Sequence, residues 1–262
     1  MTYRFVAITG ASSGIGAALA ERLATPGCLL VLLGRNTERL ERIAAVCAAK
    51  GATCRKVEVD VRDRARIAIL CEQLDRELGL DLLIANAGIL DGRHADEAVE
   101  TAATARRVLE TNLLATLDVV HAVLPGMRSR RRGGIVLVSS LAAFYPLPDA
   151  PAYSASKAAL VSYGLALRDS VRHEGVKIAV ACPGFVNTPM SEDHVGPHPG
   201  AIAADDAARR ILAGLEADRA LIGFPAVSFW LSRLSLLVPD SWRRRDTEKN
   251  RFHVRPRPTA GT

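Results

Sequence analysis

Seven short apolar segments alternate along the chain with longer stretches in which apolar residues recur at helical spacing. Most of these segments are near-continuous runs of Val, Leu, Ile and Ala, which is typical of strands buried on both faces of a parallel sheet. They are RFVAIT (4–9), LLVLLG (29–34), CRKVEVD (54–60), LLIANAG (82–88), GIVLVSS (134–140), KIAVACPG (177–184) and ALIGF (220–224). The alternation predicts an α/β fold in which helices cover both faces of a seven-stranded parallel sheet.

Length and composition agree with this prediction. A chain of 262 residues with 49% hydrophobic but only 5% aromatic residues can bury a large core of small aliphatic side chains in one domain. No internal linker and no repeat beyond the alternation of strands and helices interrupts the pattern. We therefore expect one doubly wound Rossmann domain over residues 1–239, followed by a basic, flexible tail over residues 240–262.

A glycine-rich turn joins the first predicted strand to the first helix. The segment TGASSGIG (9–16) contains Gly10, Gly14 and Gly16. Glycine accepts positive φ and lets the backbone approach a phosphate closely, and a helix that starts near Ile15 offers unpaired N–H groups to a pyrophosphate. A tight connection without a ligand is the alternative. The strand–turn–helix context favours the phosphate site.

Three polar residues in the segment 134–160 suggest proton-transfer chemistry. Tyr153 and Lys157 are four residues apart in a helical run, so they share one helical face, and Ser140 ends a strand. A phenol with a pKa of about 10 is a poor acid or base at neutral pH, but a nearby ammonium lowers that pKa. The alternative is an ordinary tyrosine and lysine on an exposed helix, since this spacing recurs by chance.

Taken in order, these motifs resemble the short-chain dehydrogenase/reductase family. The matching segments run from near Tyr3 to about residue 225. Each motif is weak alone, whereas the ordered set is highly specific. One departure is Ala85, where the family often has a second Asn. The segments are TGASSGIG (9–16), DV (60–61), ANAG (85–88), Asn112 in ETNLLAT, the strand that ends at Ser140, YSASK (153–157) and PGFVNTPM (183–190).

The resemblance implies a catalytic set of Asn112, Ser140, Tyr153 and Lys157. Tyr153 would donate a proton to a carbonyl oxygen during hydride transfer, or accept it in the reverse reaction. Lys157 would lower the tyrosine pKa and bind the nicotinamide ribose, and Ser140 would orient the carbonyl. The backbone carbonyl of Asn112 would hold a relay water. Ser139 is the weaker candidate because adjacent strand residues point to opposite faces.

The same resemblance implies a nicotinamide cofactor along the carboxyl ends of the strands. Asp60 would hold the adenine amino group, Val61 would pack on the ring, and Val186 would offer its backbone to the carboxamide. The expected contacts are Gly10, Ser12, Ser13, Gly14, Ile15, Gly16, Arg35, Asp60, Val61, Asn86, Ala87, Gly88, Tyr153, Lys157, Pro183, Gly184, Val186 and Thr188.

The end of the second strand predicts which cofactor is bound. NAD-binding proteins of this fold carry an acid there that holds the ribose hydroxyls, but here Gly34 is followed by Arg35. A guanidinium fork suits the 2′-phosphate of NADP(H), with Ser12 as a second contact. The alternative is that Arg35 is a solvated loop residue. We predict NADP(H).

The expected substrate wall is mostly apolar and lacks an obvious carboxylate clamp. This favours an apolar ketone, aldehyde or secondary alcohol, reduced in vivo, although the same residues could be core. Residues 188–205, rich in Gly and Pro, are expected to form a mobile lid. The wall residues are Ser140, Leu141, Phe144, Tyr145, Phe185 and Met190.

A protein of this fold could also bind NADP without turnover, as a sensor or scaffold. A pure binder need not keep a phenol, an ammonium, a serine and an asparagine together, so an enzyme is favoured.

The five cysteines form no CxxC pair, and the chain enters its first strand within a few residues of Met1. We therefore expect no disulfide framework and no cleavable signal, and a reducing cytoplasm. His194 and His198 are predicted to be loop residues rather than metal ligands, because Gly196 and Pro197 break the helix between them. No metal site is expected.

Two regions of the sequence predict how the chain assembles and what its surface contacts. In the family, helices equivalent to 101–127 and 153–174 pair across a two-fold axis, which implies a homodimer or homotetramer. Residues 224–245 are apolar and then basic, and the tail carries most of the net charge of +6. This charge is weak evidence for nucleic acid, and none is expected. We favour packing of the apolar segment on the pocket or a subunit over peripheral membrane contact.

Overall fold

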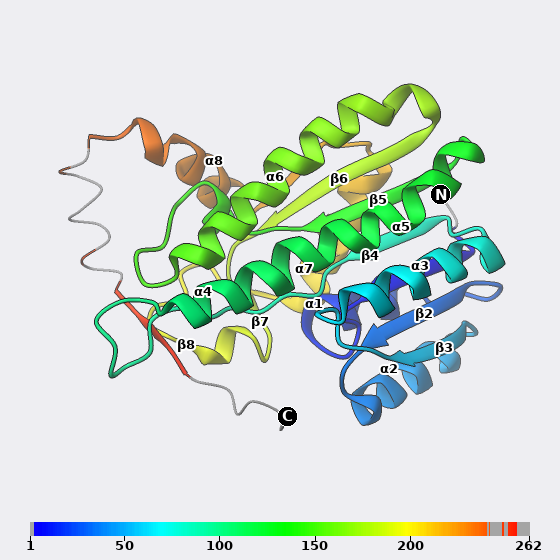
Figure 1. Cartoon of the computed structure of the whole chain (residues 1–262), viewed down its shortest axis with the longest axis horizontal. Helices are drawn as coiled ribbons and strands as arrows, with labels where there is room; N and C mark the ends of the chain where they lie inside the picture. The colour runs from blue at the N-terminus through cyan, green and yellow to red at the C-terminus, as the bar shows by residue number, and fades with distance from the viewer. Residues whose placement is uncertain (1–2, 240, 242–247, 249–250, 256–262) are drawn as a thin grey trace.

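The computed structural model describes residues 3–239, 241, 248 and 251–255 (Figure 1). Its centre is a sheet of seven parallel strands in the order β10-β6-β5-β4-β1-β2-β3. This confirms the predicted fold class. The strands are β1 (Phe5–Thr9), β2 (Leu29–Gly34), β3 (Thr53–Glu58), β4 (Leu82–Ala85), β5 (Gly133–Val138), β6 (Val176–Pro183) and β10 (Leu221–Phe224).

Helices cover both faces of the sheet, because alternate residues of each strand point to opposite sides. Val6 and Ile8 of β1 face one apolar cluster, and Ala7 faces the other. Helices α1 (Gly14–Leu23), α2 (Thr37–Ala49) and α7 (Ala204–Glu216) cover the first side. Helices α3 (Arg64–Leu78), α5 (Ala115–Ser129) and α6 (Pro151–Val171) cover the second, and α4 (Ala102–Leu109) lies against α6.

Local sequence signals set the ends of several helices. Asn36 and Asp63 accept hydrogen bonds from the backbone amides three residues later and so cap α2 and α3. Gly79 ends α3 in the left-handed region with φ +65°. A single π-turn, Glu110–Leu114, joins α4 to α5. The combined helix Ala102–Ser129 is long and apolar enough to cross a membrane, but half of its most apolar stretch is buried in this fold.

The strand order reverses between β1 and β4, which are neighbours in the sheet although β2 and β3 intervene in the sequence. Loops that leave the carboxyl ends of these two strands diverge and create a crevice, the usual ligand site of doubly wound sheets. Two short ladders lie apart from the main sheet. Strand β7 (Val186–Asn187) pairs with β9 (Ile202–Ala203), and β8 (His194–Val195) pairs with β11 (His253–Val254).

The last of these ladders differs from the sequence prediction. Residues 251–255 belong to the tail that we expected to be flexible, yet Phe252 is 3% exposed and Val254 is 1% exposed. In this structure the backbone of the segment pairs with the expected lid, so residues 251–255 are described here as part of the folded domain. The remaining tail residues, apart from 241 and 248, lie outside the described part of the chain.

The apolar segment after β10 is only partly packed. Helix α8 (Ala226–Leu234) buries Phe229, whose ring meets Phe144 edge to face at 5.7 Å. Other large apolar side chains of this segment face outward within the described structure. They are Val227, Trp230, Leu231, Leu234, Leu237 and Val238.

Candidate active site

The glycine-rich turn lies at the reversal point of the sheet. Gly10 and Gly14 have φ of +67° and +57°, a region that side-chain-bearing residues rarely adopt. A Cβ on Gly16 would stand 2.3 Å from the Gly10 carbonyl oxygen, so α1 can pack against the turn only because position 16 is glycine. The hydroxyl of Ser13, at the N-cap of α1, makes no capping hydrogen bond with the helix backbone. These features form the cradle predicted for a pyrophosphate.

Thr9 and Asn86 hold the turn against β4. The Thr9 hydroxyl oxygen accepts hydrogen bonds from the backbone amides of Asn86 and Ala87, each at 3.0 Å. The Asn86 side-chain amide donates to the carbonyl oxygens of Thr9 at 3.0 Å and Gly10 at 3.2 Å. Sequence analysis missed Thr9 as a site residue, although its signal was present as the first letter of TGASSGIG.

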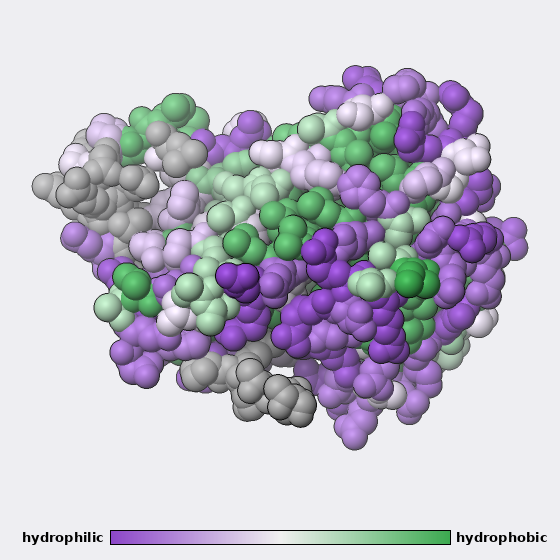
Figure 2. All heavy atoms as spheres, in the orientation of Figure 1, coloured by the Kyte–Doolittle hydropathy of each residue, from purple (hydrophilic) through white to green (hydrophobic). Residues whose placement is uncertain are grey.

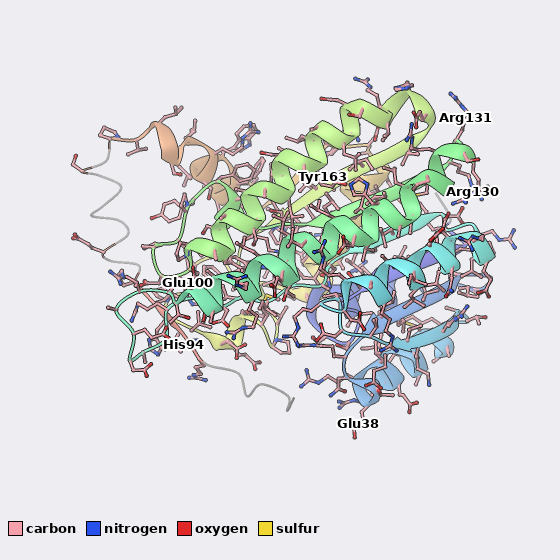
Figure 3. The ribbon with its side chains drawn as sticks, viewed as in Figure 1. Glu38, His94, Glu100, Arg130, Arg131 and Tyr163 are labelled. Carbon is pink, nitrogen blue, oxygen red and sulfur yellow. The ribbon has the colours of Figure 1, made fainter. Side chains whose placement is uncertain are left out.

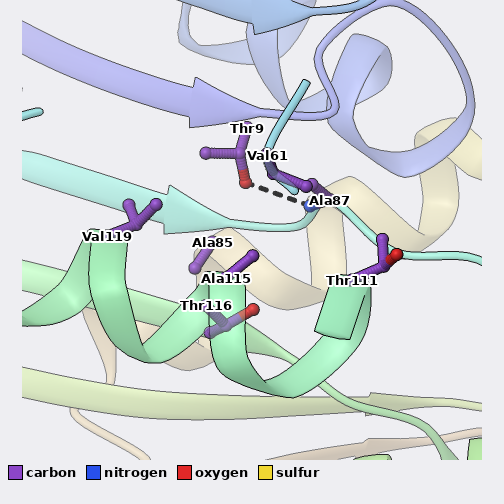
Figure 4. Close-up of a pocket in the computed structure, with 8 residues that line it drawn as sticks. All are labelled: Thr9, Val61, Ala85, Ala87, Thr111, Ala115, Thr116 and Val119. Atoms are coloured by element: carbon purple, nitrogen blue, oxygen red, sulfur yellow. Dashed lines mark hydrogen bonds between the residues drawn. The ribbon is translucent and has the colours of Figure 1, made fainter. Parts of the chain in front are cut away.

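A shallow surface depression lies beside this turn (Figure 4). Its walls are apolar or carry hydroxyl groups, and they come from the ends of β1 and β4 and from the π-turn and α5. Val61 and Ala87, both predicted cofactor contacts, are among its residues. The lining consists of Thr9, Val61, Ala85, Ala87, Thr111, Ala115, Thr116 and Val119.

The segment after β6 forms a second wall over the glycine turn. Pro183 ends β6, and Val186 in β7 is buried. A Cβ on Gly14 would approach Thr188 Cγ2 to 3.0 Å, so the two loops are in contact at that point. The glycine turn and residues 183–188 therefore lie against each other, and the absence of side chains at Gly10, Gly14 and Gly16 suits a turn that binds a dinucleotide.

Ser140 and Tyr153 meet at the carboxyl end of β5. Ser140 begins the short helix Leu141–Ala143, where its Oγ accepts from the Ala142 amide at 3.1 Å. Its hydroxyl also lies near the Tyr153 side chain on α6. Burial raises the pKa of Tyr153, while the neighbouring Ser140 hydroxyl opposes that rise. The direction is opposite to the sequence prediction, and the neutral phenol keeps its proton at pH 7.

Lys157 lies one helical turn from Tyr153 and is 5% exposed. Its Nζ is 5.6 Å from the tyrosine ring centre and donates to the Val138 carbonyl oxygen at 2.9 Å. Burial lowers the pKa of Lys157 to about 8, which leaves the ammonium mostly charged at pH 7. Ser139, which follows β5, is buried and donates to the Lys157 carbonyl oxygen of α6 at 2.7 Å.

Asn112 lies within the π-turn and is fully buried. Its side chain accepts from the Ile89 amide at 2.8 Å and donates to the Ile89 carbonyl oxygen at 2.9 Å. Its Nδ2 also donates to Ser156 Oγ at 3.2 Å. The predicted relay atom, the Asn112 carbonyl oxygen, accepts from the Thr116 hydroxyl at 2.9 Å. Asn112 thus joins the loop after β4 to α6.

Arg35 follows Gly34 at the carboxyl end of β2 and has a side chain that is 57% exposed. Its guanidinium lies 3.9 Å from Asp60 Oδ2. A Cβ on Gly34 would lie 3.4 Å from Ser12 Oγ, so positions 12, 34 and 35 adjoin one another. Burial opposes ionisation of Asp60, but hydrogen bonds from Arg62 prevail and lower its pKa.

The predicted substrate residues divide into two groups. Leu141 is buried in the core, and Phe144 packs on Phe229 of α8 rather than standing free. Phe185 stacks on His198 with ring centres 4.8 Å apart and meets His194 edge to face at 5.1 Å. The remaining predicted wall residues, Tyr145 and Met190, are half-buried.

The two histidines are hydrogen-bonded to each other, with His198 Nε2 3.0 Å from His194 Nδ1. Burial and the neighbouring His198 lower the pKa of His194 to about 4, so it is neutral at pH 7. Among the described residues, no group of three His, Cys, Asp or Glu side chains is arranged to hold a metal ion.

The arrangement combines three chemical capabilities at one edge of the sheet. A neutral phenol has a serine hydroxyl close enough to affect its pKa, a buried ammonium lies beside the phenol, and a glycine cradle suits a pyrophosphate. Gly88, on the loop after β4, lies close to two of these polar side chains. A Cβ at this position would stand 3.1 Å from Asn112 Oδ1 and 3.5 Å from Lys157 Nζ. The site can therefore donate a proton close to where a dinucleotide would lie.

Comparison with known proteins agrees with this geometry. Residues 4–196 match the family model described as short chain dehydrogenase. The chain belongs to the short-chain dehydrogenase family. An "uncharacterized oxidoreductase" of Myxococcus xanthus is 34% identical over 241 residues, covering 92% of this chain and 94% of that protein.

Two solved short-chain dehydrogenases share the fold over most of their length. One from Sphingobium yanoikuyae, in complex with NADPH, has a TM-score of 0.77 at 25% identity and covers 95% of this chain and 96% of its own. One from Mycobacterium paratuberculosis, bound to NAD, has a TM-score of 0.75 at 25% identity, with coverage of 87% and 98%. The chain is thus an oxidoreductase of a family that binds nicotinamide cofactors.

Proposed function

We propose that this short-chain dehydrogenase reduces an apolar ketone or aldehyde to an alcohol with NADPH and catalyses the reverse reaction with NADP. The observation that carries the proposal is the position of the buried Lys157 ammonium, 5.6 Å from the centre of the Tyr153 ring, with the Ser140 hydroxyl close enough to the phenol to affect its pKa. A sensor or scaffold that only bound the cofactor would need the glycine cradle but not this group of proton-handling side chains.

The chain's own residues account for the proton transfer. The reduced nicotinamide, when bound, supplies a hydride to the carbonyl carbon. Ser140 and Tyr153 would both hydrogen-bond the carbonyl oxygen and draw electron density from the carbon. Tyr153 then transfers its hydroxyl proton to that oxygen as the C–O π bond breaks. The charge left on the phenolate is stabilised by the Lys157 ammonium, which is mostly protonated at pH 7.

Tyr153 carries its proton at neutral pH. Burial raises the pKa of this phenol above its ordinary value, so the protonated form that carbonyl reduction requires is the one present. The hydrogen bonds from Ser140 and Tyr153 would be stronger in the transition state than in the bound substrate, because the carbonyl oxygen gains negative charge only as the hydride arrives. Groups that bind an alkoxide better than a carbonyl accelerate the reaction rather than merely tightening binding.

Three neighbouring positions support NADP rather than NAD. Gly34 supplies no carboxylate for the ribose hydroxyls, and the exposed Arg35 can turn its guanidinium toward a 2′-phosphate. Ser12 Oγ lies beside Gly34 and offers a second donor. Asp60 is already held by Arg62 through both carboxylate oxygens, which reduces its repulsion of a phosphate.

An apolar substrate is supported by the side chains around the phenol. Tyr153 packs against a small buried apolar cluster, and the Phe185 ring packs on His194 and His198 of the segment expected to form the lid. Because His194 is neutral at pH 7, this wall offers aromatic rings rather than charge. A charged substrate would be poorly compensated there.

The decisive test is Tyr153→Phe in assays of NADPH oxidation with a panel of apolar ketones and aldehydes. We expect turnover to fall by about 10²–10⁴-fold, because the positioned proton donor is lost. The affinity for NADPH, measured by fluorescence titration, should change little. Activity above a tenth of wild type would refute Tyr153 as the acid. Cofactor binding by the wild type without turnover on the whole panel would favour the sensor.

A further inference from the structure

The C-terminal segment Arg251–Arg255 crosses the carboxyl edge of the sheet at the entrance to the site. Its strand β11 pairs antiparallel with β8, with His253 opposite Val195 and Val254 opposite His194. The Arg255 amide donates to the Asp193 carbonyl oxygen at 2.9 Å. Figure 1 shows β11 running beside β8, next to the loop that leads into α4. The segment is thereby fixed to the predicted lid.

A buried carboxylate anchors the other side of the same segment. The Asp149 side chain, which is 0% exposed, accepts from Arg251 Nε at 2.8 Å and from the Phe252 amide at 3.0 Å. It also accepts from Arg93 Nε at 2.7 Å. Burial opposes ionisation of Asp149, but these bonds prevail and lower its pKa. A carboxylate buried this deeply is stable only with such partners, so the anchor depends on all three donors.

Arg93 completes the anchor from the loop after β4. Its Nη2 donates to the Phe252 carbonyl oxygen at 2.6 Å, and its own carbonyl oxygen accepts from the Val254 amide at 2.9 Å. Its amide donates to the Asp149 carbonyl oxygen at 2.7 Å. Figure 3 labels His94 and Glu100 on this loop, beside α4. The loop after β4, the loop before α6 and the C-terminal segment thus meet at one carboxylate.

The apolar side chains of the segment Arg251–Arg255 are buried beside the proposed proton donor. Phe252 and Val254 form a buried cluster with Ala150, and Tyr153 packs against this cluster together with Leu90 and Leu147. The segment therefore places Phe252, just before β11, and Val254, within β11, in the cluster on which Tyr153 packs.

The Phe252 ring also contacts the predicted lid. It stacks on His194 with ring centres 4.1 Å apart and an interplanar angle of 24°. His194 in turn meets Phe185, one of the predicted substrate residues, at 5.1 Å. A continuous aromatic wall therefore extends from the Tyr153 cluster to the lid, and a residue 99 positions after Tyr153 in the sequence supplies part of it.

We propose that β11 is a built-in wall of the substrate pocket, with Phe252 as a side chain that limits substrate size and Asp149 as the residue that positions it. The proposal rests on the function proposed above. Doubly wound sheets bind ligands at the carboxyl ends of their strands, and β11 closes this edge on the side of Tyr153. An apolar ketone would be held between the phenol and the Phe252 ring, so its bulk beyond the carbonyl determines the fit.

The first test is Phe252→Ala, assayed with cyclohexanone and with the bulkier 4-phenylcyclohexanone. We expect the ratio of kcat/KM for the bulky to the small ketone to rise at least tenfold, because truncation opens space beside Tyr153. NADPH affinity should remain unchanged. An unchanged ratio, or an equal change for both ketones, would overturn the proposal. If the wild type turned over neither ketone, the result would instead contradict the proposed function.

The second test, Asp149→Asn, has a readout that does not depend on activity. Loss of the charge weakens the bonds from Arg93 and Arg251, so the amides of Phe252, Val254 and Arg255 should exchange with deuterium at least tenfold faster. The KM for cyclohexanone should rise more than kcat falls. Asp96→Asn, an exposed acid on the loop after β4, is the matched control.

A pair of truncations separates the strand from the rest of the tail. A chain ending at residue 255 keeps β11 and should retain the wild-type ratio of bulky to small ketone. A chain ending at residue 250 lacks β11 and should show the ratio of Phe252→Ala. Equal ratios for the two truncated chains would contradict a role for the strand, as would wild-type exchange rates in Asp149→Asn.

Discussion

The ammonium of Lys157 donates to the Val138 carbonyl oxygen at 2.9 Å and thereby ties α6 to the end of β5. This bond holds the charge 5.6 Å from the centre of the Tyr153 ring while the lysine stem stays buried. One side chain thus has two roles, because it fixes the position of the catalytic helix and places a cation beside the phenol. Its burial, and not a neighbouring cation, is the main cause of its lowered pKa.

The lowered pKa predicts how activity depends on pH. Since the pKa of Lys157 is about 8, the ammonium is mostly present at pH 7 and is lost as pH rises through 8. We expect kcat/KM for ketone reduction to decline about tenfold per pH unit above that value. Lys157→Arg, which stays protonated, should lose this decline, even if its rate is lower. A flat wild-type profile between pH 7 and 9.5 would show that the charge is not required.

The main sheet could be predicted from the sequence because its strands are buried on both faces. LLVLLG and GIVLV contain no polar side chain, and both form strands close to the predicted limits, β2 and β5. The glycine turn could also be predicted from the sequence, because Gly10 and Gly14 adopt the positive φ that the motif predicts. In the buried strands and in the glycine turn, the residue types that favour the local conformation are also the ones that the tertiary structure needs.

Contacts between distant segments could not be predicted in this way. Phe252 lies in a basic tail that contains too few apolar residues to indicate a strand, and its anchor Asp149 lies 103 positions earlier. The pKa of Tyr153 was predicted in the wrong direction for a related reason. Helical spacing gives the distance to Lys157, whereas desolvation depends on every segment packed around the phenol.

We expect the chain to form a homodimer, or a tetramer built from such dimers, through α5 and α6. Apolar residues gather along these helices in the middle of the face shown in Figure 2, and Tyr163 of α6 lies on this face 3.3 Å from His121 of α5 (Figure 3). Leu117, one turn before His121, is half-buried and should be covered by the partner. Leu117→Arg should yield a monomer in light scattering, because a buried unpaired charge is costly. Ile69→Arg, on the exposed face of α3, is the control. A monomeric wild type at micromolar concentration would contradict the assignment.

The outward face of α8 suggests contact with a membrane surface that contains anionic lipid. Trp230, Leu231 and Leu234 are more than half exposed, Arg233 lies among them, and three arginines (243–245) follow in the sequence. Apolar and basic residues together suit the interface of an anionic bilayer. The full chain should co-sediment with vesicles that contain phosphatidylserine and bind less at high salt. The double variant Trp230→Ser, Leu234→Ser should bind at least tenfold more weakly, whereas Ile69→Ser should not. Equal binding to purely phosphatidylcholine vesicles, or none at all, would contradict this expectation.

Cofactor preference should depend on Arg35. A charge-assisted hydrogen bond to the 2′-phosphate contributes roughly 1.5–3 kcal/mol, so Arg35→Ala should weaken NADPH binding about ten- to hundredfold. NADH binding should change little, because NADH lacks that phosphate. Arg42→Ala, an exposed arginine further along α2, is the matched control for a general loss of positive charge. Fluorescence titration of both cofactors measures these effects without turnover.

Adding Gly34→Asp to Arg35→Ala should shift the preference further toward NADH. The new carboxylate would repel a 2′-phosphate and accept hydrogen bonds from the ribose hydroxyls. Its Cβ would stand 3.3 Å from Leu40 Cδ2 and 3.4 Å from Ser12 Oγ, so these side chains must give way by a few tenths of an ångström. Circular dichroism would establish that the double variant still folds. If the wild type already binds NADH more tightly, or if Arg35→Ala leaves the NADPH dissociation constant unchanged, then Arg35 does not determine the cofactor.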